Sequence, residues 1–204
     1  MPKDADGHLI AGTLSPQRLV DPGIARPEYV GKAAPAKHTR GHIYNTSEVD
    51  RIRTAGRIAS QALDAVERAI RPGLSTDEID RIGHDFVVNA GAYPSTLGYR
   101  GYPKSLCTSL NEVICHGIPD NTVLDEGDIV NVDITAFFDG MHGDTNRTFI
   151  VGQTSPEISD LVAHTYEALM RGIKAVMPGR EVNVIGRTIE AYAKRFGYGV
   201  VRDF

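Results

Sequence analysis

The chain has 204 residues, and its 41% hydrophobic and 24% charged residues are typical of a globular protein with one domain. Its 22 Lys and Arg against 26 Asp and Glu give a net charge of −4, which excludes the basic excess of a nucleic-acid-binding protein. The N-terminal residues lack the apolar run of a signal peptide, and no window approaches the roughly 18 apolar residues of a membrane span. These observations predict a cytoplasmic protein that binds no nucleic acid and enters no membrane.

Residues 1–45 form a segment rich in Pro and Gly that keeps neither a helical nor an alternating apolar period. We therefore predict an N-terminal arm without a core element, followed by a folded domain over residues 46–204. Six Lys and Arg against four Asp and Glu make the arm mildly basic. Two interpretations are open: the arm contacts a ribosome or another acidic surface, or it is a solvated tail that lies on the domain.

Two amphipathic helices are predicted next. Apolar residues recur every three or four positions from Val49 to Ile70, with Ser47 as the predicted N-cap, and the sequence "RPG" ends this helix. Ser75 with Glu78 three residues later is the pattern of a capping box, which begins a second helix that ends at Gly91.

The chain then changes to short β-rich runs, and strands are predicted at 93–98, 106–110, 112–115, 129–138 and 141–151. Ser155 and Pro156 begin a third helix, which "MPG" ends. "RPG" and "MPG" are 106 positions apart, and Gly91 and Gly197 keep that offset. We interpret this as two copies of a helix–turn–helix unit, the alternative being chance similarity between helix pairs. Only "YGVVRDF" follows Gly197, so the second copy is expected to lack a sheet and to leave one helix face exposed.

The stretch "NVDITAFFDGMHGDTNRTFIVG" at 131–152 places carboxylates inside two predicted strands. Asp139 and Gly140 between apolar runs are a strong signal for a two-residue hairpin turn. A turn centred there brings Asp133 and Asp144 to the same face as diagonal neighbours, roughly 7–8 Å apart at the backbone. A slip of one residue would place them on opposite faces.

Two carboxylates on one face repel each other, and their burial costs several kcal/mol unless a positive group neutralises them. Three uses are open: ligands of one or two divalent metal ions, an acid/base pair for glycoside cleavage, and a structural pair capped by Lys or Arg. Oxygen ligands favour Mn, Fe(II), Co or Zn. His142 has the parity to be a further ligand or part of the wall, whereas Asp128 and Asp139 are expected to form turns. His116 follows a short β run and is expected at a strand end that reaches a cleft.

The segments "YPSTLGYRGYPKSLCTSLNEVICHGIPD" and "GDIVNVDITAFFDGMHGDTNRTF" closely resemble methionine aminopeptidases of the bacterial, type I kind, and the resemblance extends over residues 47–204. It implies an α+β protein with the pita-bread fold, whose two pseudo-symmetric halves agree with the repeat. Residues 46–204 would then be the N-terminal part of a metallo-aminopeptidase catalytic domain, without the sheet of the second half.

The resemblance also assigns site residues. Two divalent metal ions (Co, Mn, Fe or Zn) share five side chains in this family, and Asp133 and Asp144 match two of them. His116 matches a histidine that hydrogen-bonds the scissile amide and steadies the tetrahedral intermediate. His142 is not a ligand in the family. The methionine pocket would be lined by Thr96, Tyr99, Tyr102 and Cys107, whose rings and thiol suit a thioether.

The activity implied by the resemblance is removal of the N-terminal methionine from nascent polypeptides, by metal-assisted hydrolysis in a monomer. The remaining ligands, one His and two Glu, belong to the sheet expected to be missing. Two aspartates alone should coordinate the metals incompletely, so the 204-residue chain is expected to be insufficient for catalysis. Two alternatives are a non-catalytic module that binds peptide N termini and another pita-bread hydrolase, such as a proline-specific aminopeptidase.

Overall fold

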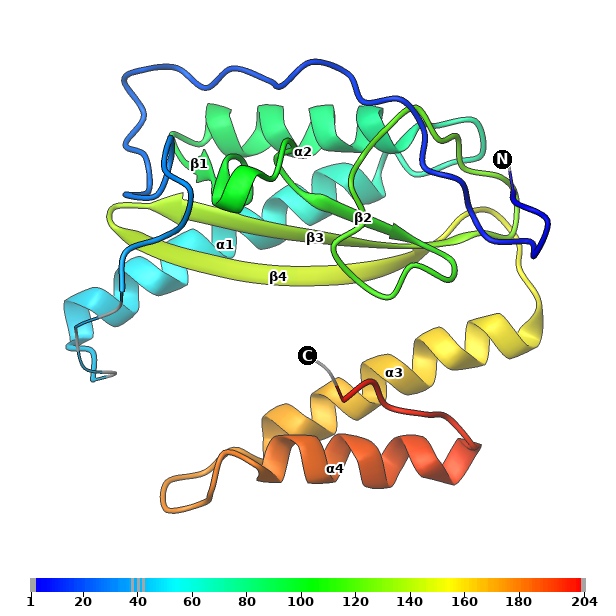
Figure 1. The fold of residues 1–204 in the computed structure, drawn as a ribbon. Coiled ribbons are helices and arrows are strands. Elements are labelled where there is room, and N and C mark those ends of the chain that lie inside the picture. Colours follow the sequence, from blue (N-terminus) through cyan, green and yellow to red (C-terminus); the bar gives the residue numbers. More distant parts are fainter. Residues whose placement is uncertain (1–2, 38, 40, 42, 203–204) are drawn as a thin grey trace. The chain divides into compact units, whose positions relative to one another are not determined.

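The computed structural model describes residues 3–37, 39, 41 and 43–202. Residues 1–2, 38, 40 and 42 of the predicted arm, and 203–204 at the other end, lie outside the described residues. The chain divides into two compact units, Met1–Gln153 and Thr154–Phe204 (Figure 1). No helix in the described part of the chain is long and apolar enough to cross a membrane.

The first unit contains a four-stranded antiparallel sheet built around β3 (Ile129–Phe138). β4 (Met141–Ile150) lies along one edge of β3, while β1 (Tyr93–Pro94) and β2 (Cys107–Leu110) follow one another along the other edge. The predicted strand at 112–115 is wrong, because the chain turns there with Asn111 in the left-handed region at φ 49°. The strand predicted at 93–98 shortens to β1, since successive backbone turns begin at Pro94 and Thr96.

Two helices cover one face of this sheet, α1 (Thr46–Glu67) and α2 (Thr76–Asn89) (Figure 1). The predicted N-cap Ser47 is wrong: Asn45 caps α1 and forms a capping box with Glu48, which moves the start of the helix two residues earlier. Ser75 caps α2 as predicted by accepting a hydrogen bond from the Glu78 amide. The predicted capping box is not completed, because the Glu78 carboxylate pairs with Arg81 in place of the Ser75 backbone amide.

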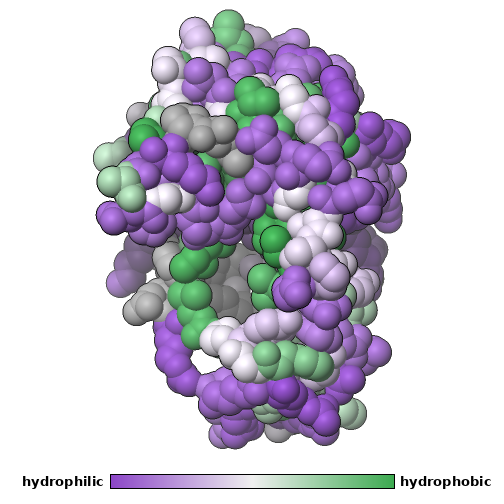
Figure 2. Space-filling view, turned by 90° about the vertical axis from the view of Figure 1, so that its right-hand side faces the viewer, coloured by the Kyte–Doolittle hydropathy of each residue, from purple (hydrophilic) through white to green (hydrophobic). Residues whose placement is uncertain are grey.

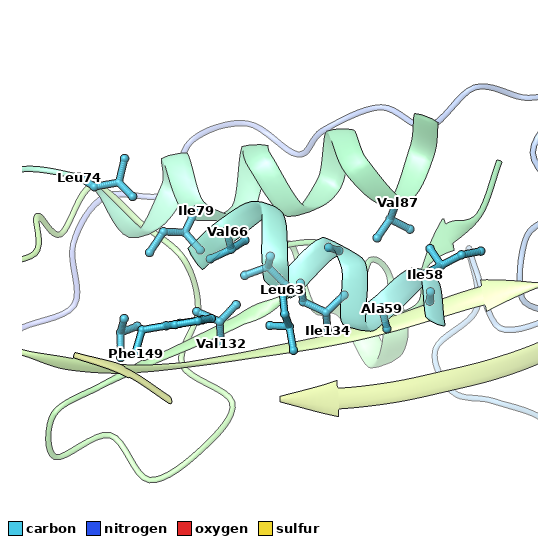
Figure 3. Close-up of a cluster of buried hydrophobic side chains, with 14 of the residues drawn as sticks. Ile58, Ala59, Leu63, Val66, Leu74, Ile79, Val87, Val132, Ile134 and Phe149 are labelled. Carbon is cyan, nitrogen blue, oxygen red and sulfur yellow. The ribbon is translucent and has the colours of Figure 1, made fainter. Parts of the chain in front are cut away.

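The core lies between the two helices and the sheet (Figure 3). Along β3, every second residue from Val130 to Ala136 is buried, so the intervening Asp133 and Thr135 point to the opposite face. The polar residues of β3 therefore lie on the face of the sheet away from the helices. The labelled core side chains come from α1, α2, β3, β4 and the turn before α2: Ile58, Ala59, Leu63, Val66, Leu74, Ile79, Val87, Val132, Ile134 and Phe149.

A glycine sets the close approach of β4 to α1. A Cβ atom added to Gly143 would lie 2.1 Å from the backbone nitrogen of Gly56 and 2.3 Å from the carbonyl carbon of Ala55. Both atoms belong to the helix backbone and have little freedom to move. Gly143 thus fixes the strand segment that carries His142 and Asp144.

The described residues of the arm form no helix or strand, in agreement with the prediction, apart from an isolated bridge between Lys3 and Leu9. The arm nevertheless contributes buried side chains. Val20 and Tyr29 are buried and pack in a small cluster with Tyr93 and Leu97. Figure 1 shows the arm, in blue, running along α2. Long-range packing of this kind leaves no local periodicity to detect.

A buried network of charges fastens the arm to α2. The Lys104 ammonium, whose side chain is fully buried, donates to Asp77 Oδ1 at 2.5 Å and to Ser15 Oγ at 2.6 Å. Arg18 donates from Nη2 to Asp77 Oδ2 and from Nε to Asp80 Oδ2, each at 3.0 Å. Burial opposes the ionisation of Asp77, but hydrogen bonds from Lys104 and Ser15 and the two cations hold its pKa below the usual range.

Asp77→Ala is expected to destabilise the first unit by about 3–5 kcal/mol, because Lys104 then keeps a buried charge without its carboxylate. Urea denaturation measures this loss, and trypsin cleavage near Arg18 should become faster. The neighbouring variant Glu78→Ala is the control, since it removes an exposed pair with Arg81 and should cost at most about 1 kcal/mol. The lowered pKa of Asp77 gives stability that is present above its unfolded pKa of 3.8 and lost as pH falls below it. Equal losses in the two variants would contradict a role for the network.

The second unit is a helical hairpin of α3 (Pro156–Ala175) and α4 (Val184–Ala193), followed by a 3₁₀ turn. Ser155 caps α3 as predicted. The glycines of the proposed repeat share left-handed backbones, with φ of 85° at Gly73 and 81° at Gly179, and 74° at Gly91 and 78° at Gly197. Both helix pairs therefore use the same turn geometry. Hydrophobic residues are visible at the surface in Figure 2, and those exposed in and after α3 include Leu161, Leu169, Ile173, Val176 and Met177.

Candidate functional site

The β3–β4 hairpin has the predicted register. Asp139 and Gly140 form the turn with φ of 46° and 78°, and Thr135 lies opposite Asp144. Asp133 lies opposite Asn146. Asp133 and Asp144 line one cavity on the face of the sheet away from the helices, so the predicted meeting of the two carboxylates is confirmed.

The cavity has a volume of about 720 Å³. Backbone turns of the loop between β1 and β2 form one side, and the hairpin forms another. The structure brings together all the residues that the sequence singled out for metal, catalysis and substrate: Thr96, Tyr99, Tyr102, Cys107, His116, Asp133 and Asp144.

The two carboxylates lie close enough to repel each other. Burial, together with the charge and hydrogen bonding of Asp144, raises the pKa of Asp133 to about 6, and nearby His116 partly opposes this rise. Asp133 Oδ1 is buried without a hydrogen-bond partner, while the Thr135 hydroxyl donates to Asp144 Oδ1 at 2.7 Å. Among the ion pairs of the described residues, none joins Lys or Arg to either carboxylate. The arrangement favours a bound cation over a structural pair.

A divalent metal ion fits the chemistry of this pair. Two oxygen ligands on one face and an orphaned buried carboxylate oxygen are suited to a hard or borderline cation. Within the described residues there is no group of three or more His, Cys, Asp or Glu side chains able to hold a metal. Asp133 and Asp144 are the two carboxylates that would hold such an ion.

His116 reaches the cavity from a strained and well-fixed loop. Its backbone is left-handed at φ 56°, a conformation that is uncommon for residues other than glycine. The next residue, Gly117, accepts hydrogen bonds from the Thr108 amide and the Tyr102 hydroxyl, both at 2.9 Å. A Cβ at Gly117 would lie 2.2 Å from the Thr108 carbonyl oxygen. The loop is therefore held against β2, and the exposed imidazole stands beside Asp133.

Cys107 and Tyr102 give the cavity a neutral wall. Burial raises the pKa of the Cys107 thiol to about 11, and burial also raises the pKa of the Tyr102 phenol. Cys107 is therefore a thiol at neutral pH, which excludes a thiolate nucleophile in this state. Both cysteines of the described residues, Cys107 and Cys115, are free thiols.

His142 and Asp128, the other positions considered in the sequence, are held by hydrogen bonds within the fold. His142 lines the cavity, and its Nδ1 lies 2.9 Å from Ser95 Oγ. Asp128 accepts hydrogen bonds from the Asn111 side chain and the Asp125 amide, which confirms its role in a turn.

Sequence reasoning missed several residues at the cavity, among them Tyr29, Ser95 and Thr135. The predicted register already placed Thr135 opposite Asp144, so its hydrogen bond had a detectable signal. Tyr29 comes from the arm, and no pattern in the sequence indicated its place at the cavity.

Comparisons with known proteins identify the family of the chain. The fold is that of a class of metallopeptidases, and the sequence matches metallopeptidase family M24 over residues 50–204. The chain belongs to this family, and the predicted fold is confirmed. Methionine aminopeptidase 2 of Mycobacterium tuberculosis is 57% identical over 196 residues, which cover 96% of this chain and 69% of that protein.

The solved structures show the same relationship. Methionine aminopeptidase from Rickettsia prowazekii has a TM-score of 0.78 and 40% identity, over 79% of this chain and 65% of that one. The prolidase from Pyrococcus furiosus, with a TM-score of 0.66 over 77% and 45% of the two chains, is 22% identical and shares the fold alone. The chain spans between 51% and 69% of the length of curated relatives that it matches.

Proposed function

We propose that this chain carries the methionine-binding part and two metal ligands of a methionine aminopeptidase, which removes the N-terminal methionine from nascent polypeptides in the cytoplasm. The observation that carries the proposal is the convergence of Asp133, Asp144 and His116 on one cavity. The 57% identity to a methionine aminopeptidase supports it.

Asp133 and Asp144 differ in their hydrogen bonding. Asp133 offers a buried oxygen without a partner, and Asp144 is oriented by the hydroxyl of Thr135. Together they would hold divalent cations, two in our proposal, of Co, Mn, Fe or Zn. When bound, such ions polarise a carbonyl and lower the pKa of a water molecule. His116, fixed beside Asp133, would hydrogen-bond the scissile amide.

The neutral wall suits the methionine side chain. Tyr99 and Tyr102 offer aromatic rings, and Cys107 offers an uncharged thiol, to which a flexible thioether can adapt. Arg100 also lines the cavity, and the two carboxylates of its lining suit the free amine of a peptide. We propose that Thr96, Tyr99, Tyr102 and Cys107 bind the side chain.

A non-catalytic module that binds peptide N termini is the second candidate. It is favoured by the lack of any group of three metal-ligating side chains within residues 3–37, 39, 41 and 43–202. Such a module would use the same cavity without turnover. Contact of the arm with a ribosome stays a prediction.

Peptide binding and release of methionine test these proposals together. The chain should bind Met-Ala-Ser in calorimetry, with Ala-Pro bound at least about 10-fold more weakly, because a proline dipeptide lacks the thioether for the neutral wall. Methionine release should be followed over a series of Mn(II) concentrations. Binding without release at every concentration would favour the module, and release at an ordinary rate would contradict the expected insufficiency of two ligands. Preference for Ala-Pro would overturn the methionine assignment.

A further inference from the structure

Tyr29 brings the N-terminal arm into the wall of the cavity. Its side chain is buried, and the phenol donates a hydrogen bond to the backbone carbonyl oxygen of Ser95 at 2.5 Å. Burial raises the pKa of Tyr29 to about 12, so the phenol is a neutral donor at physiological pH. The bond ties the arm to the loop that follows β1.

The Tyr29 ring contacts two further residues of the cavity. Its centroid lies 5.2 Å from that of Tyr99, and the rings are nearly perpendicular at 87°, the favourable edge-to-face arrangement. On another side it lies 6.3 Å from the His142 ring at an angle of 16°. Because His142 Nδ1 also lies 2.9 Å from Ser95 Oγ, Tyr29, Ser95 and His142 contact one another in a triangle. Among the ring contacts of the described residues, Tyr29 alone of the three contacts Tyr99.

The docking of the arm determines where Tyr29 lies. Upstream, Arg18 is held by Asp77 and Asp80 through the buried charge network. Between Arg18 and Tyr29 in the sequence, Val20 is buried, and its carbonyl oxygen accepts a hydrogen bond from Arg26 at 3.2 Å. The tyrosine is therefore delivered to the cavity by a fixed segment of backbone.

We propose that Tyr29 is a positioning residue that orders the loop 95–102 and thereby sets the shape of the methionine cavity. This inference rests on the proposed function for the identity of the ligand. A wall held in one position discriminates an unbranched side chain from a branched one, whereas a mobile wall adapts to both. The presence of Tyr29 should therefore increase the affinity for methionine more than the affinity for leucine.

Three variants separate the contributions. Tyr29→Ala removes the ring and the hydroxyl, and Tyr29→Phe keeps the ring contacts with Tyr99 and His142 while losing the bond to Ser95. Leu19→Ala is the control, because Leu19 is on the same arm and its side chain is 91% exposed. Hydrogen exchange of residues 95–102 and calorimetric titration with L-methionine and L-leucine are measured on each folded protein.

Tyr29→Ala should speed hydrogen exchange in residues 95–102 at least about 5-fold. It should weaken the binding of L-methionine about 10-fold and lower the ratio of the affinity for L-methionine to that for L-leucine. Tyr29→Phe should largely keep the preference for L-methionine over L-leucine. Leu19→Ala should have the same exchange rates and affinities as the original protein. Unchanged exchange in Tyr29→Ala overturns the positioning role whatever the ligand is. Faster exchange with an unchanged preference reduces Tyr29 to a structural residue and also overturns it. If the original protein binds no L-methionine, the proposed function fails, and hydrogen exchange alone then decides the positioning role.

Discussion

Asp133→Asn is expected to weaken divalent metal binding at least about 100-fold and, in the metal-free chain, to raise the free energy of unfolding. The two effects share one cause. Asp133 is a part-buried carboxylate beside Asp144, and burial and this neighbour raise its pKa to about 6. A neutral amide removes the repulsion together with the ligand charge. Calorimetry with Mn(II) measures the first effect, and urea denaturation in EDTA measures the second.

The pH dependence of this gain has a definite sign. A carboxylate whose pKa is raised on folding contributes stability below its unfolded pKa of 3.8, and the contribution is lost as pH rises through about 6. The variant should therefore gain on the order of 1–3 kcal/mol near pH 7 and little near pH 4. Asp139→Asn is the matched control, because this turn carboxylate is exposed. Undiminished Mn(II) binding by Asp133→Asn would exclude Asp133 as a ligand.

Gly143→Ala is expected to destabilise the first unit by about 3–5 kcal/mol or to prevent its folding. The added methyl group would lie 2.1 Å from the backbone nitrogen of Gly56, so β4 and α1 must separate. Because the whole stability of a domain is about 5–15 kcal/mol, a loss of this size is decisive. The circular dichroism melting curve and the soluble yield measure it.

Gly56, which lies on α1 opposite Gly143, gives the control. A Cβ at Gly56 meets nothing within 4 Å, and alanine favours a helix interior by about 1 kcal/mol over glycine. Gly56→Ala should therefore leave the unit intact or stabilise it slightly. A Gly143→Ala protein that melts at the original temperature would show that α1 and β4 are not held as closely as the contact indicates.

Local signals predicted the elements that place the candidate site. Asp139 and Gly140 determined the hairpin turn, and the alternation along β3 then fixed which face Asp133 occupies. Ser75 and Ser155 marked helix starts through side-chain caps, which are also local. The N-cap at Ser47 was wrong because Asn45 offers a competing cap with a better-placed Glu48. Such choices depend on small differences in free energy.

Contacts between distant segments could not be predicted. The arm has no apolar period, yet Tyr29 meets Ser95 and His142 across long stretches of chain. Gly143 is likewise one glycine among many in the sequence, and only the packing of α1 against β4 gives it a role. The roles of Asp133, Asp144 and His116 in binding and catalysis stay predictions that the variants above can test.

The hairpin also has a consequence for the order of folding. A two-residue turn joins the strands that carry Asp133 and Asp144, so the two carboxylates meet by a local movement of the chain. Hairpins form in about 1–10 μs, whereas the docking of Tyr29 onto His142 must close a loop of the intervening chain against its entropy. We expect the acidic pair to assemble first and to stand open to ions in solution before the arm closes the wall beside it.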